Sequence, residues 1–258
     1  MALLSIIMPV YNEAHTVGEA LHRGMQQALP SGVEREFIVV DDGSRDGTRA
    51  VLASLPNSCT LLTHEMNRGK GAAVRTGITA AHGDIILIYD ADLEYEPHDW
   101  PKLLQPILHG EADVVYGSRF LSGTHRVLYF WHSVGNKLVT LWSNMWTNLN
   151  LTDMETGAKV FTRRAIEGIN FRARRFGFEP EFTARMAHRG LRIYEVAVSY
   201  HGRSYWEGKK ITWRDGFAAL WHVVRWNASA LAIARVSKRA ASKSSPSPFQ
   251  DARDPRSD

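Results

Sequence analysis

Two aspartates that close a short apolar run carry the strongest chemical signal in the chain. Residues 85–88 are isoleucine or leucine throughout, as in a strand buried on both faces; Asp90 and Asp92 end this strand, and Glu94 follows. Side chains at i and i+2 of an extended segment point the same way, so these three carboxylates are expected to converge. Carboxylate oxygens favour Mg²⁺ or Mn²⁺. A D-x-D motif alone is as readily a solvated acidic turn.

Apolar runs and helical segments are expected to alternate along the first half of the chain. The runs predicted as strands cover residues 3–10, 37–40, 60–63, 85–88 and 112–117. This order predicts an α/β fold with a doubly wound, mostly parallel sheet and flanking helices. The carboxyl ends of parallel strands meet at one edge of a sheet. Tyr11-Asn12-Glu13 and Asp41-Asp42 should therefore lie beside Asp90 and Asp92, where a nucleotide would bind.

The glycine-rich segment 67–77, which begins N-R-G-K-G, has two interpretations. Glycines at the start of a helix can bring backbone amides to a phosphate, or they can let the helix pack tightly on the sheet. The segment is neither a Walker loop nor a dinucleotide fingerprint after the first strand. The sequence leaves the two interpretations open.

The second half is rich in aromatic residues. A helix over 127–149 carries several tryptophans, and Leu138, Leu141 and Met145 keep helical spacing on it; this pattern fits a core helix or one that lies at a membrane interface. A last amphipathic helix is expected over 213–236, with one apolar stripe formed by Trp213, Phe217, Leu220, Trp221, Val224, Ala228 and Leu231. The tail, 237–258, is polar and is expected to be disordered.

Composition limits the class of protein. The 258 residues include 44% hydrophobic and 22% charged residues, as in a soluble globular protein, and the net charge of +4 suits anionic substrates or an anionic membrane surface. A single cysteine, Cys59, fits a reducing compartment, so a cytoplasmic location is expected. No nucleic-acid-binding motif and no membrane-spanning run is found, so nucleic acid is not an expected partner.

Five motifs, in this order and spacing, give the chain a family resemblance. They are I-I-M-P-V-Y-N-E, V-V-D-D-G-S-R-D-G-T, N-R-G-K-G-A-A-V-R-T-G, D-A-D-L-E and Y-G-S-R-F. Over residues 1–225 the chain resembles family 2 glycosyltransferases of the GT-A fold, and within them the branch similar to dolichol-phosphate mannose synthase. The resemblance implies a glycosyltransferase domain over 1–236, with a nucleotide-sugar half at 1–118 and an acceptor half at 119–236.

The resemblance also implies a role for each matching residue. Pro9, Tyr11, Glu13, Asp41 and Asp42 would hold the nucleotide, and Gly71 would border its base. Asp90 and Asp92 would hold the metal ion, while the family often has glutamine in place of Glu94. Arg119 would meet the acceptor phosphate, and Arg203 and Lys209 would close on the diphosphate. Asp153 and Glu181 match acidic positions near the site.

The implied reaction is metal-dependent, inverting transfer of a hexose from a nucleotide diphosphate sugar to a polyprenyl phosphate. The membrane contact of such an enzyme would be peripheral, at the inner face of the membrane, through the tryptophan-rich helix. An alternative is a soluble hydroxyl acceptor, which needs a carboxylate base such as Asp153 or Glu181. A third hypothesis is a protein that binds the nucleotide sugar without catalysis.

Overall fold

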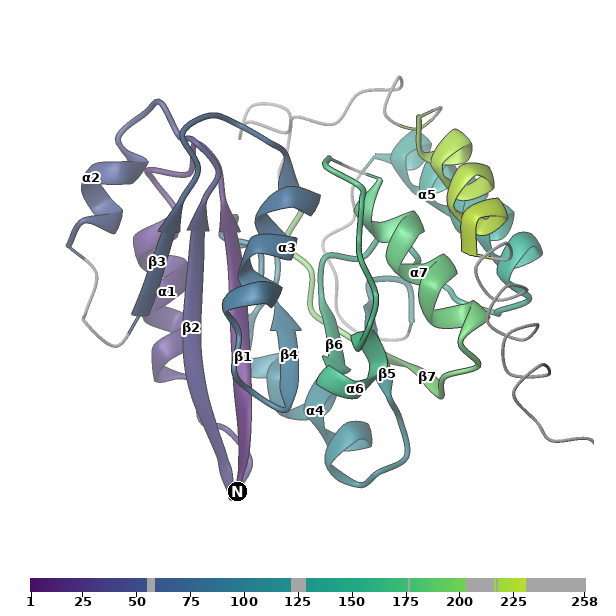
Figure 1. The fold of residues 1–258 in the computed structure, drawn as a ribbon, viewed down its shortest axis with the longest axis horizontal. Coiled ribbons are helices and arrows are strands. Elements are labelled where there is room, and N and C mark those ends of the chain that lie inside the picture. Colours follow the sequence, from purple (N-terminus) through teal and green to yellow (C-terminus); the bar gives the residue numbers. More distant parts are fainter. Residues whose placement is uncertain (55–58, 122–128, 176, 203–215, 217, 231–258) are drawn as a thin grey trace, which may run out of the picture.

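The protein is built in three layers, with one twisted sheet between two sets of helices (Figure 1). The computed structural model describes residues 1–54, 59–121, 129–175, 177–202, 216 and 218–230. In chain order its elements are β1 (Ala2–Val10), α1 (Val17–Gln26), β2 (Val33–Asp41), α2 (Thr48–Leu52), β3 (Cys59–Thr63), α3 (Lys70–Ala80), β4 (Ile85–Ile88), the 3₁₀ turn η1 (Pro97–Asp99), α4 (Trp100–Leu108), β5 (Val114–Ser118), α5 (Phe130–Thr147), β6 (Lys159–Thr162), α6 (Arg163–Ile166), α7 (Phe178–His188) and β7 (Ile193–Ala197). The predicted phosphate-binding residues Arg203 and Lys209 and the tail at 237–258 lie outside the described residues.

The seven strands lie in the order β3-β2-β1-β4-β6-β5-β7. Every neighbouring pair is parallel except those made by β6, which runs antiparallel to both β4 and β5. The predicted α/β class with a mostly parallel sheet is confirmed. Strand β6 follows residue 118 but lies between two strands that precede it, so the two predicted halves share one sheet.

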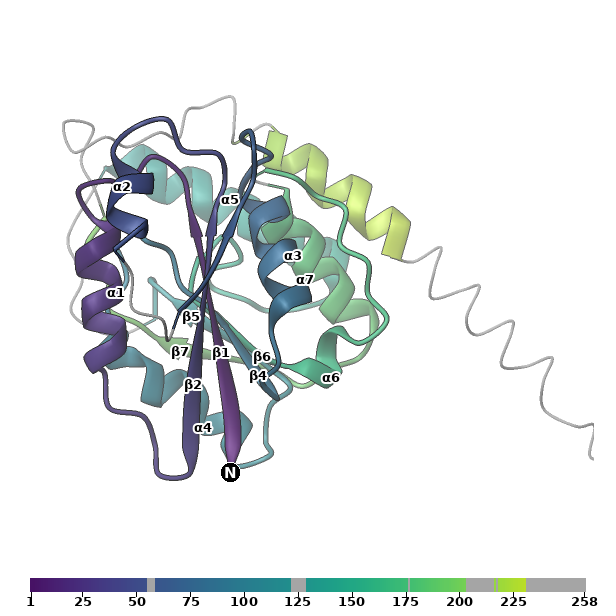
Figure 2. The ribbon, with the colours of Figure 1, turned by 60° about the vertical axis from the view of Figure 1, so that its left-hand side comes forward.

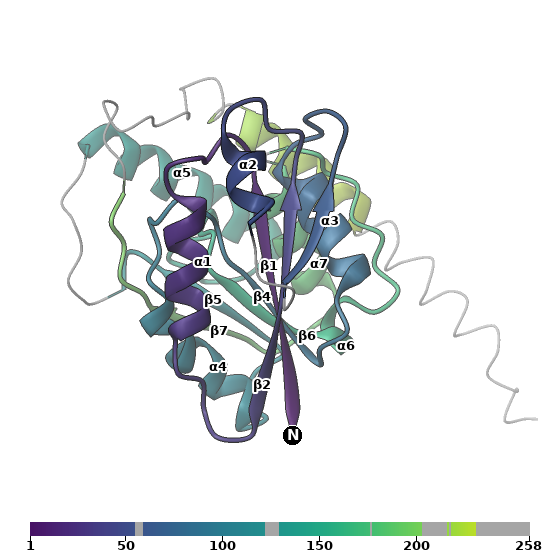
Figure 3. The same ribbon diagram turned by 90° about the vertical axis from the view of Figure 1, so that its left-hand side faces the viewer.

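Side chains of the central strand β1 alternate between the two faces of the sheet. Leu4, Ile6 and Met8 pack in one buried cluster with α1 and α4, and Ile7 packs in another with α3 and α7. Figures 2 and 3 show α1 and α4 on one side of the strands, and α3 and α7 on the other. Burial on both faces explains why β1 and β4 are continuous apolar runs in the sequence.

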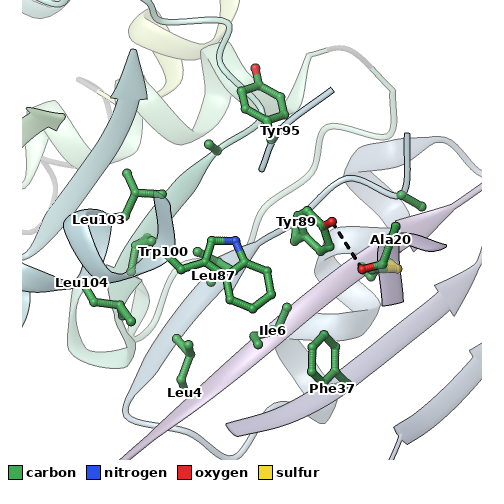
Figure 4. Packing of buried hydrophobic residues seen from close by; sticks show 14 of the residues in the cluster. Leu4, Ile6, Ala20, Phe37, Leu87, Tyr89, Tyr95, Trp100, Leu103 and Leu104 are labelled. Atoms are coloured by element: carbon green, nitrogen blue, oxygen red, sulfur yellow. Dashed lines mark hydrogen bonds between the residues drawn. The ribbon is translucent and has the colours of Figure 1, made fainter. Parts of the chain in front are cut away.

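A group of aromatic rings fixes the end of β4 (Figure 4). Trp100 meets Tyr89 edge-on, with ring centroids 5.1 Å apart, and lies 6.3 Å from Phe37. The Tyr89 hydroxyl donates a hydrogen bond to the carbonyl oxygen of Ala20, 3.3 Å away. Because Tyr89 immediately precedes Asp90, this packing determines where the chain leaves the sheet.

The apolar stripe of α5 faces outward. Leu138, Leu141 and Met145 are 57%, 58% and 68% exposed, and Trp131 is 77% exposed. The core-helix interpretation is therefore wrong for this stripe. The inward side combines the buried Val139 with a polar row: Asn136, Thr140 and Asn144, spaced four residues apart, bond to the segment 151–154.

Residues 218–230 form a helix that packs on the sheet domain, and of the described stripe residues only Leu220 packs against the core there. Ala219, Val223 and Trp226 are buried in the cluster that also holds α7, whereas Trp221 of the predicted stripe is exposed. Among the described helices, none combines the length and the apolar character needed to cross a bilayer.

Candidate active site

The carboxyl ends of β1, β2 and β4 lie side by side, at the upper edge of the sheet in Figure 1. The Asp42 amide donates to the carbonyl oxygen of Val10 at 2.8 Å, and the Tyr89 amide donates to that of Ile7 at 2.9 Å. The three polar clusters that follow these strands therefore meet at one edge, as the sequence predicted.

The segment that follows β4 is a turn and not an extended strand. Leu93 has a φ of +60°, in the left-handed region that side chains such as leucine rarely adopt. Asp92 stabilises the turn by accepting a hydrogen bond from the Glu94 amide at 3.1 Å. The expectation that alternate side chains point together in an extended segment does not hold here. Residues held in this region often mark functional sites.

Glu94 is bound by Tyr200. The Tyr200 hydroxyl donates to Glu94 Oε2 at 2.9 Å, and the His201 amide donates to the Glu94 carbonyl oxygen at 2.8 Å. Across residues 1–230 where the structure is described, no group of three or more acidic, histidine or cysteine side chains is arranged to hold one ion. The structure therefore does not bring Glu94 into a three-carboxylate site with Asp90 and Asp92.

Lys70, the first residue of α3, joins Asp90 to a second carboxylate. Its ammonium lies 2.8 Å from Asp90 Oδ2 and 3.3 Å from Glu179 Oε1. Although burial works against its charge, these carboxylates raise the pKa of Lys70. Glu179 Oε2 is buried and has no hydrogen-bond partner among the residues that the structure describes.

Two further buried ionisable side chains, Glu155 and Lys159, interact with Glu179. Burial, and then repulsion from Glu179, raise the pKa of Glu155, and burial lowers the pKa of Lys159. The Lys159 ammonium donates to the Thr156 carbonyl oxygen and lies 5.2 Å from the centre of the Tyr116 ring. Glu155 Oε1, like Glu179 Oε2, lacks a partner in the described part of the chain. The site thus contains buried acceptor oxygens that a cation or a hydroxyl group would satisfy.

The residues present fit a divalent cation. Asp90 and Asp92 are both partly exposed at the carboxyl edge of the sheet, and carboxylate oxygens are the donors that Mg²⁺ and Mn²⁺ prefer. Mg²⁺ commonly uses one or two carboxylates and completes its shell with water and substrate phosphates. A two-aspartate site therefore needs no third protein carboxylate.

Asp41 and Asp42 are buried, and their oxygens are used within the protein. Asp41 accepts from the Ser44 amide at 3.0 Å and from Arg49 Nε at 2.9 Å. Asp42 lies 2.6 Å from His64 Nδ1 and accepts from the amides of Arg68 and Gly69 at 2.9 and 2.7 Å. In this structure the two aspartates shape the loops around the edge, and their contact with a nucleotide stays a prediction.

The glycine-rich segment packs tightly against the chain before α7. A Cβ atom on Gly71 would lie 2.6 Å from the Ala173 carbonyl oxygen, and one on Gly69 would lie 2.2 Å from that of Arg174. The Ala72 amide donates to the same Arg174 oxygen at 3.2 Å. These contacts favour the packing interpretation of the segment. Gly71 has no room for any side chain, and its place beside a base stays a prediction.

The residues around the end of β1 are more exposed to solvent than Asp41 and Asp42. Tyr11 is exposed, whereas Pro9 and Glu13 are partly exposed. The Glu13 amide donates to Thr48 Oγ1 at 2.9 Å, and Glu13 Oε2 accepts from Thr16 Oγ1 at 2.8 Å. These three residues border the edge from which a ligand would approach.

Arg119 is held by Asp153 in a bidentate ion pair. Arg119 Nε lies 2.6 Å from Asp153 Oδ2, and Nη2 lies 2.7 Å from Oδ1. The Arg119 amide and Asn136 Nδ2 also donate to this carboxylate, each at 3.1 Å. On its other side the guanidinium lies 5.1 Å from the centre of the Tyr200 ring. The residue that binds Glu94 therefore also contacts Arg119.

Residues 5–169 match the family described as Glycosyl transferase family 2. The chain belongs to this family. The glycosyltransferase is 31% identical to the undecaprenyl-phosphate mannosyltransferase of Micrococcus luteus, over 89% of this chain and 96% of that protein. It is 28% identical to the undecaprenyl-phosphate 4-deoxy-4-formamido-L-arabinose transferase of Pseudomonas paraeruginosa, over 80% of this chain and 60% of that one. These names support the polyprenyl-phosphate branch.

Among solved structures, the glycosyltransferase resembles glucosyl-3-phosphoglycerate synthase of Mycobacterium tuberculosis, crystallised with Mn²⁺ and uridine-diphosphate-glucose. The TM-score is 0.69 at 21% identity, covering 89% of this chain and 79% of that one. At this level of identity the comparison shows the fold, which is the predicted GT-A fold.

Glu181 supports the backbone of the glycosyltransferase. It is fully buried on α7, and its Oε2 accepts from the amides of Arg172 and Ala173 at 2.8 and 2.6 Å. Its Oε1 lies 3.3 Å from Arg185 Nη2. Since Ala173 packs over Gly71, Glu181 positions the segment that covers the start of α3. Its predicted proximity to the site is indirect.

We expect Glu181→Ala to lower the free energy of unfolding by about 3–5 kcal/mol, because it leaves a buried arginine and two amides without their acceptor. Urea denaturation would measure this loss. Glu167→Ala, at an exposed position, is the control and should change stability by no more than about 0.5 kcal/mol. An equal effect of both substitutions would contradict the assignment.

Sequence reasoning did not find Lys70, Glu155, Lys159, Glu179 or Tyr200. Lys70 stands between two glycines, a pattern that indicates backbone amides rather than a side chain, and Glu179 lies two residues from Glu181 with nothing in the sequence to distinguish them. An acidic residue at the start of a helix gives no indication of which way it faces. The Lys70–Asp90 contact joins positions 20 residues apart and is visible only in the fold.

Proposed function

We propose that this glycosyltransferase is a metal-dependent, inverting enzyme that transfers a hexose from a nucleotide diphosphate sugar to a polyprenyl phosphate. The observation that carries the proposal is the bidentate pair between the partly exposed Arg119 and the buried Asp153. A guanidinium fixed in this way can bind a phosphate with little loss of side-chain freedom. The names of the Micrococcus luteus and Pseudomonas paraeruginosa relatives support an acceptor of this kind.

On the donor side, the proposal assigns the metal to Asp90 and Asp92. A divalent ion held there would supply positive charge to the diphosphate as it leaves. The synthase with a similar fold was crystallised with Mn²⁺ and uridine-diphosphate-glucose, which supports a metal of this class and a nucleotide diphosphate sugar. Tyr11 and Glu13 border the place proposed for the nucleotide.

The two candidate bases already accept hydrogen bonds from other groups of the protein, which favours a phosphate acceptor. Asp153 is occupied by Arg119, and Glu181 by Arg185 and two backbone amides. A hydroxyl acceptor needs a base within hydrogen-bond reach. A phosphate oxygen already ionised at neutral pH needs none. Its attack on the anomeric carbon from the side opposite the diphosphate would form the new glycosidic bond, break the old one and invert the centre.

The test is a partition assay. Purified protein, Mg²⁺ or Mn²⁺ and a polyprenyl phosphate are mixed with one radiolabelled nucleotide sugar at a time, and the label is followed into the organic phase. Metal-dependent transfer from one donor would support the proposal and name the sugar. Released nucleotide without organic label would favour hydrolysis or a soluble acceptor. Donor binding without any turnover would favour a non-catalytic protein.

We further propose that the outer face of α5 contacts the membrane that holds the acceptor. Phe130, Trp131, Leu138, Leu141 and Met145 form this outer face, and all are exposed. An exposed apolar face of this size on a helix is typical of a peripheral membrane or protein contact. Asn136 on the inner side of the same helix bonds to Asp153, so the contact surface lies next to the residue that holds Arg119.

Replacing Leu138 and Met145 together by glutamate should weaken binding to phospholipid vesicles by at least about 10-fold, because two apolar side chains no longer enter the interface. Vesicle co-sedimentation would measure the change. Leu61→Glu makes the same kind of change at an exposed position on β3 and should leave binding unaltered. Undiminished binding of the α5 variant would exclude α5 as the contact.

A further inference from the structure

Lys70 occupies an oxygen of the carboxylate that the proposed metal site requires. Its ammonium is 2.8 Å from Asp90 Oδ2, an ion-pair distance that is also a good hydrogen bond. The Asp90 and Lys70 side chains are 16% and 22% exposed, so the pair is shielded from most of the solvent. Charges in such a setting interact more strongly than on an open surface.

The Asp90 carboxylate also packs closely against Gly157. A Cβ atom on Gly157 would lie 2.3 Å from Asp90 Oδ2, so only a glycine leaves room for this oxygen. The Gly157 amide donates to the Tyr95 hydroxyl at 2.9 Å, which holds the glycine in place. Asp90 therefore cannot turn further toward Gly157, whereas the ammonium of Lys70 is carried on a flexible four-carbon side chain that can move it.

A second carboxylate, that of Glu179, lies close to the Lys70 ammonium. Glu179 Oε1 is already 3.3 Å from Lys70 Nζ, and the neighbouring Oε2 is buried without a partner among the described residues. A buried carboxylate oxygen without a partner is costly, so a shift of the ammonium toward Glu179 would satisfy an atom that is otherwise unsatisfied.

We propose that Lys70 is the internal counter-ion of Asp90 and passes to Glu179 when a divalent cation binds. A divalent ion at Asp90 and an ammonium on the same carboxylate repel each other, so the ammonium must withdraw for the ion to bind well. Glu179 is the acceptor for the displaced ammonium. The inference rests on the proposed metal site and adds a positioning role for Lys70 and Glu179.

The exchange predicts how metal affinity depends on both residues. Without a competing ammonium, Lys70→Met should bind Mn²⁺ about 10-fold more tightly than the wild-type protein. Without a second place for the ammonium, Glu179→Gln should bind Mn²⁺ several-fold more weakly, on the order of threefold. In the double variant the Glu179 substitution should leave the Mn²⁺ affinity of Lys70→Met almost unchanged, because there is no Lys70 ammonium for Glu179 to accept.

The double-mutant cycle separates this exchange from a general effect of charge. If the two residues acted only through the summed field, Glu179→Gln would weaken Mn²⁺ binding equally with and without Lys70. Free Mn²⁺ measured by electron paramagnetic resonance gives the affinity of each protein without any catalytic assay. Lys102→Met removes a charge paired with Asp99 and is the control, with an affinity equal to that of the wild type.

Each result decides between the alternatives. A Lys70→Met protein that binds Mn²⁺ no more tightly than the wild type, or additive effects in the double variant, would overturn the exchange and leave the proposed function standing. If Lys70→Met fails to fold, as judged by circular dichroism, unaltered Mn²⁺ affinity in Glu179→Gln would overturn it. A wild-type protein that binds no Mn²⁺ even with nucleoside diphosphate would overturn the proposed metal site itself.

Discussion

Replacing Asp92 by alanine should lower the rate of sugar transfer by about 10³-fold while the protein stays folded. A metal ion typically contributes several kcal/mol of charge stabilisation in the transition state, and each 1.4 kcal/mol corresponds to about tenfold in rate. Asp92 is one of two aspartates assigned to that ion, and its side chain is partly exposed in a turn. Removing it should therefore cost the enzyme its activity and little of its stability.

The comparison protein for Asp92→Ala is Glu96→Gln. Glu96 lies four residues further along the chain, and its carboxylate pairs with Arg23 at 3.1 Å. The Glu96→Gln variant should retain at least about half of the wild-type rate, since a surface ion pair contributes little to stability. The label-partition assay gives the rates, and thermal unfolding followed by circular dichroism checks the fold. Near-normal turnover by Asp92→Ala would contradict the assignment of the metal ion to Asp90 and Asp92.

The sequence was sufficient to predict the sheet and the edge at which the site lies. Runs such as 85–88 are apolar throughout because β4 is buried on both faces, and turn residues mark where such strands end. The order of β6 and its antiparallel direction were not predictable. The short run Lys159–Thr162 fits a strand in either direction, and the direction depends on where a long connection returns to the sheet.

The direction in which a side chain faces was harder to predict than its position. The spacing of Leu138, Leu141 and Met145 predicts that they share a face, but only the bonds of Asn136 and Thr140 to the segment 151–154 turn that face outward. Periodicity defines a stripe and does not say what covers it.

The same limit applies to the acidic residues of the site. Glu94 shares its spacing with Asp90 and Asp92, but the left-handed backbone at Leu93 ends the extended geometry on which the spacing argument rests. Asp153 and Glu181 are acidic residues of the second half, as a base would be, and both are engaged by arginines. Arg185 lies one turn along α7 from Glu181, whereas Arg119 lies 34 residues from Asp153, a pairing that the sequence alone does not show.

Asp153→Asn should raise the KM for the acceptor phosphate by about 10- to 100-fold and leave the KM for the donor within about twofold. The amide keeps the shape of the carboxylate but carries no charge, and one of its two ends donates where Asp153 only accepts. Arg119 and Asn136 both donate to that group, so one of the contacts is lost and the guanidinium moves. Losing a partner that orients a binding residue commonly costs a factor of this size.

Asparagine is preferable to alanine in this experiment because it fills the same space. Asp153→Ala would leave a cavity and remove every side-chain acceptor for Arg119, at a cost of about 3–5 kcal/mol of stability, whereas asparagine keeps one carbonyl oxygen that still accepts. A loss of activity in the alanine variant would then mix unfolding with chemistry. Glu195→Gln is a matched control: Glu195 accepts from the backbone amides of Thr152 and Asp153, not from the Arg119 guanidinium, so the acceptor KM should change less.

The dependence of the rate on pH distinguishes an orienting aspartate from a base. If Asp153 were a general base, transfer would fall at low pH as its carboxyl became protonated, and the asparagine variant would lose both this fall and up to about 10⁴-fold in kcat. If Asp153 orients Arg119, any fall at low pH reflects protonation of the acceptor phosphate, whose second pKa is near 6, and it persists in the variant. An unchanged pH profile with a raised acceptor KM is therefore the result that supports a phosphate acceptor, and a flattened profile would move the proposal to a hydroxyl acceptor.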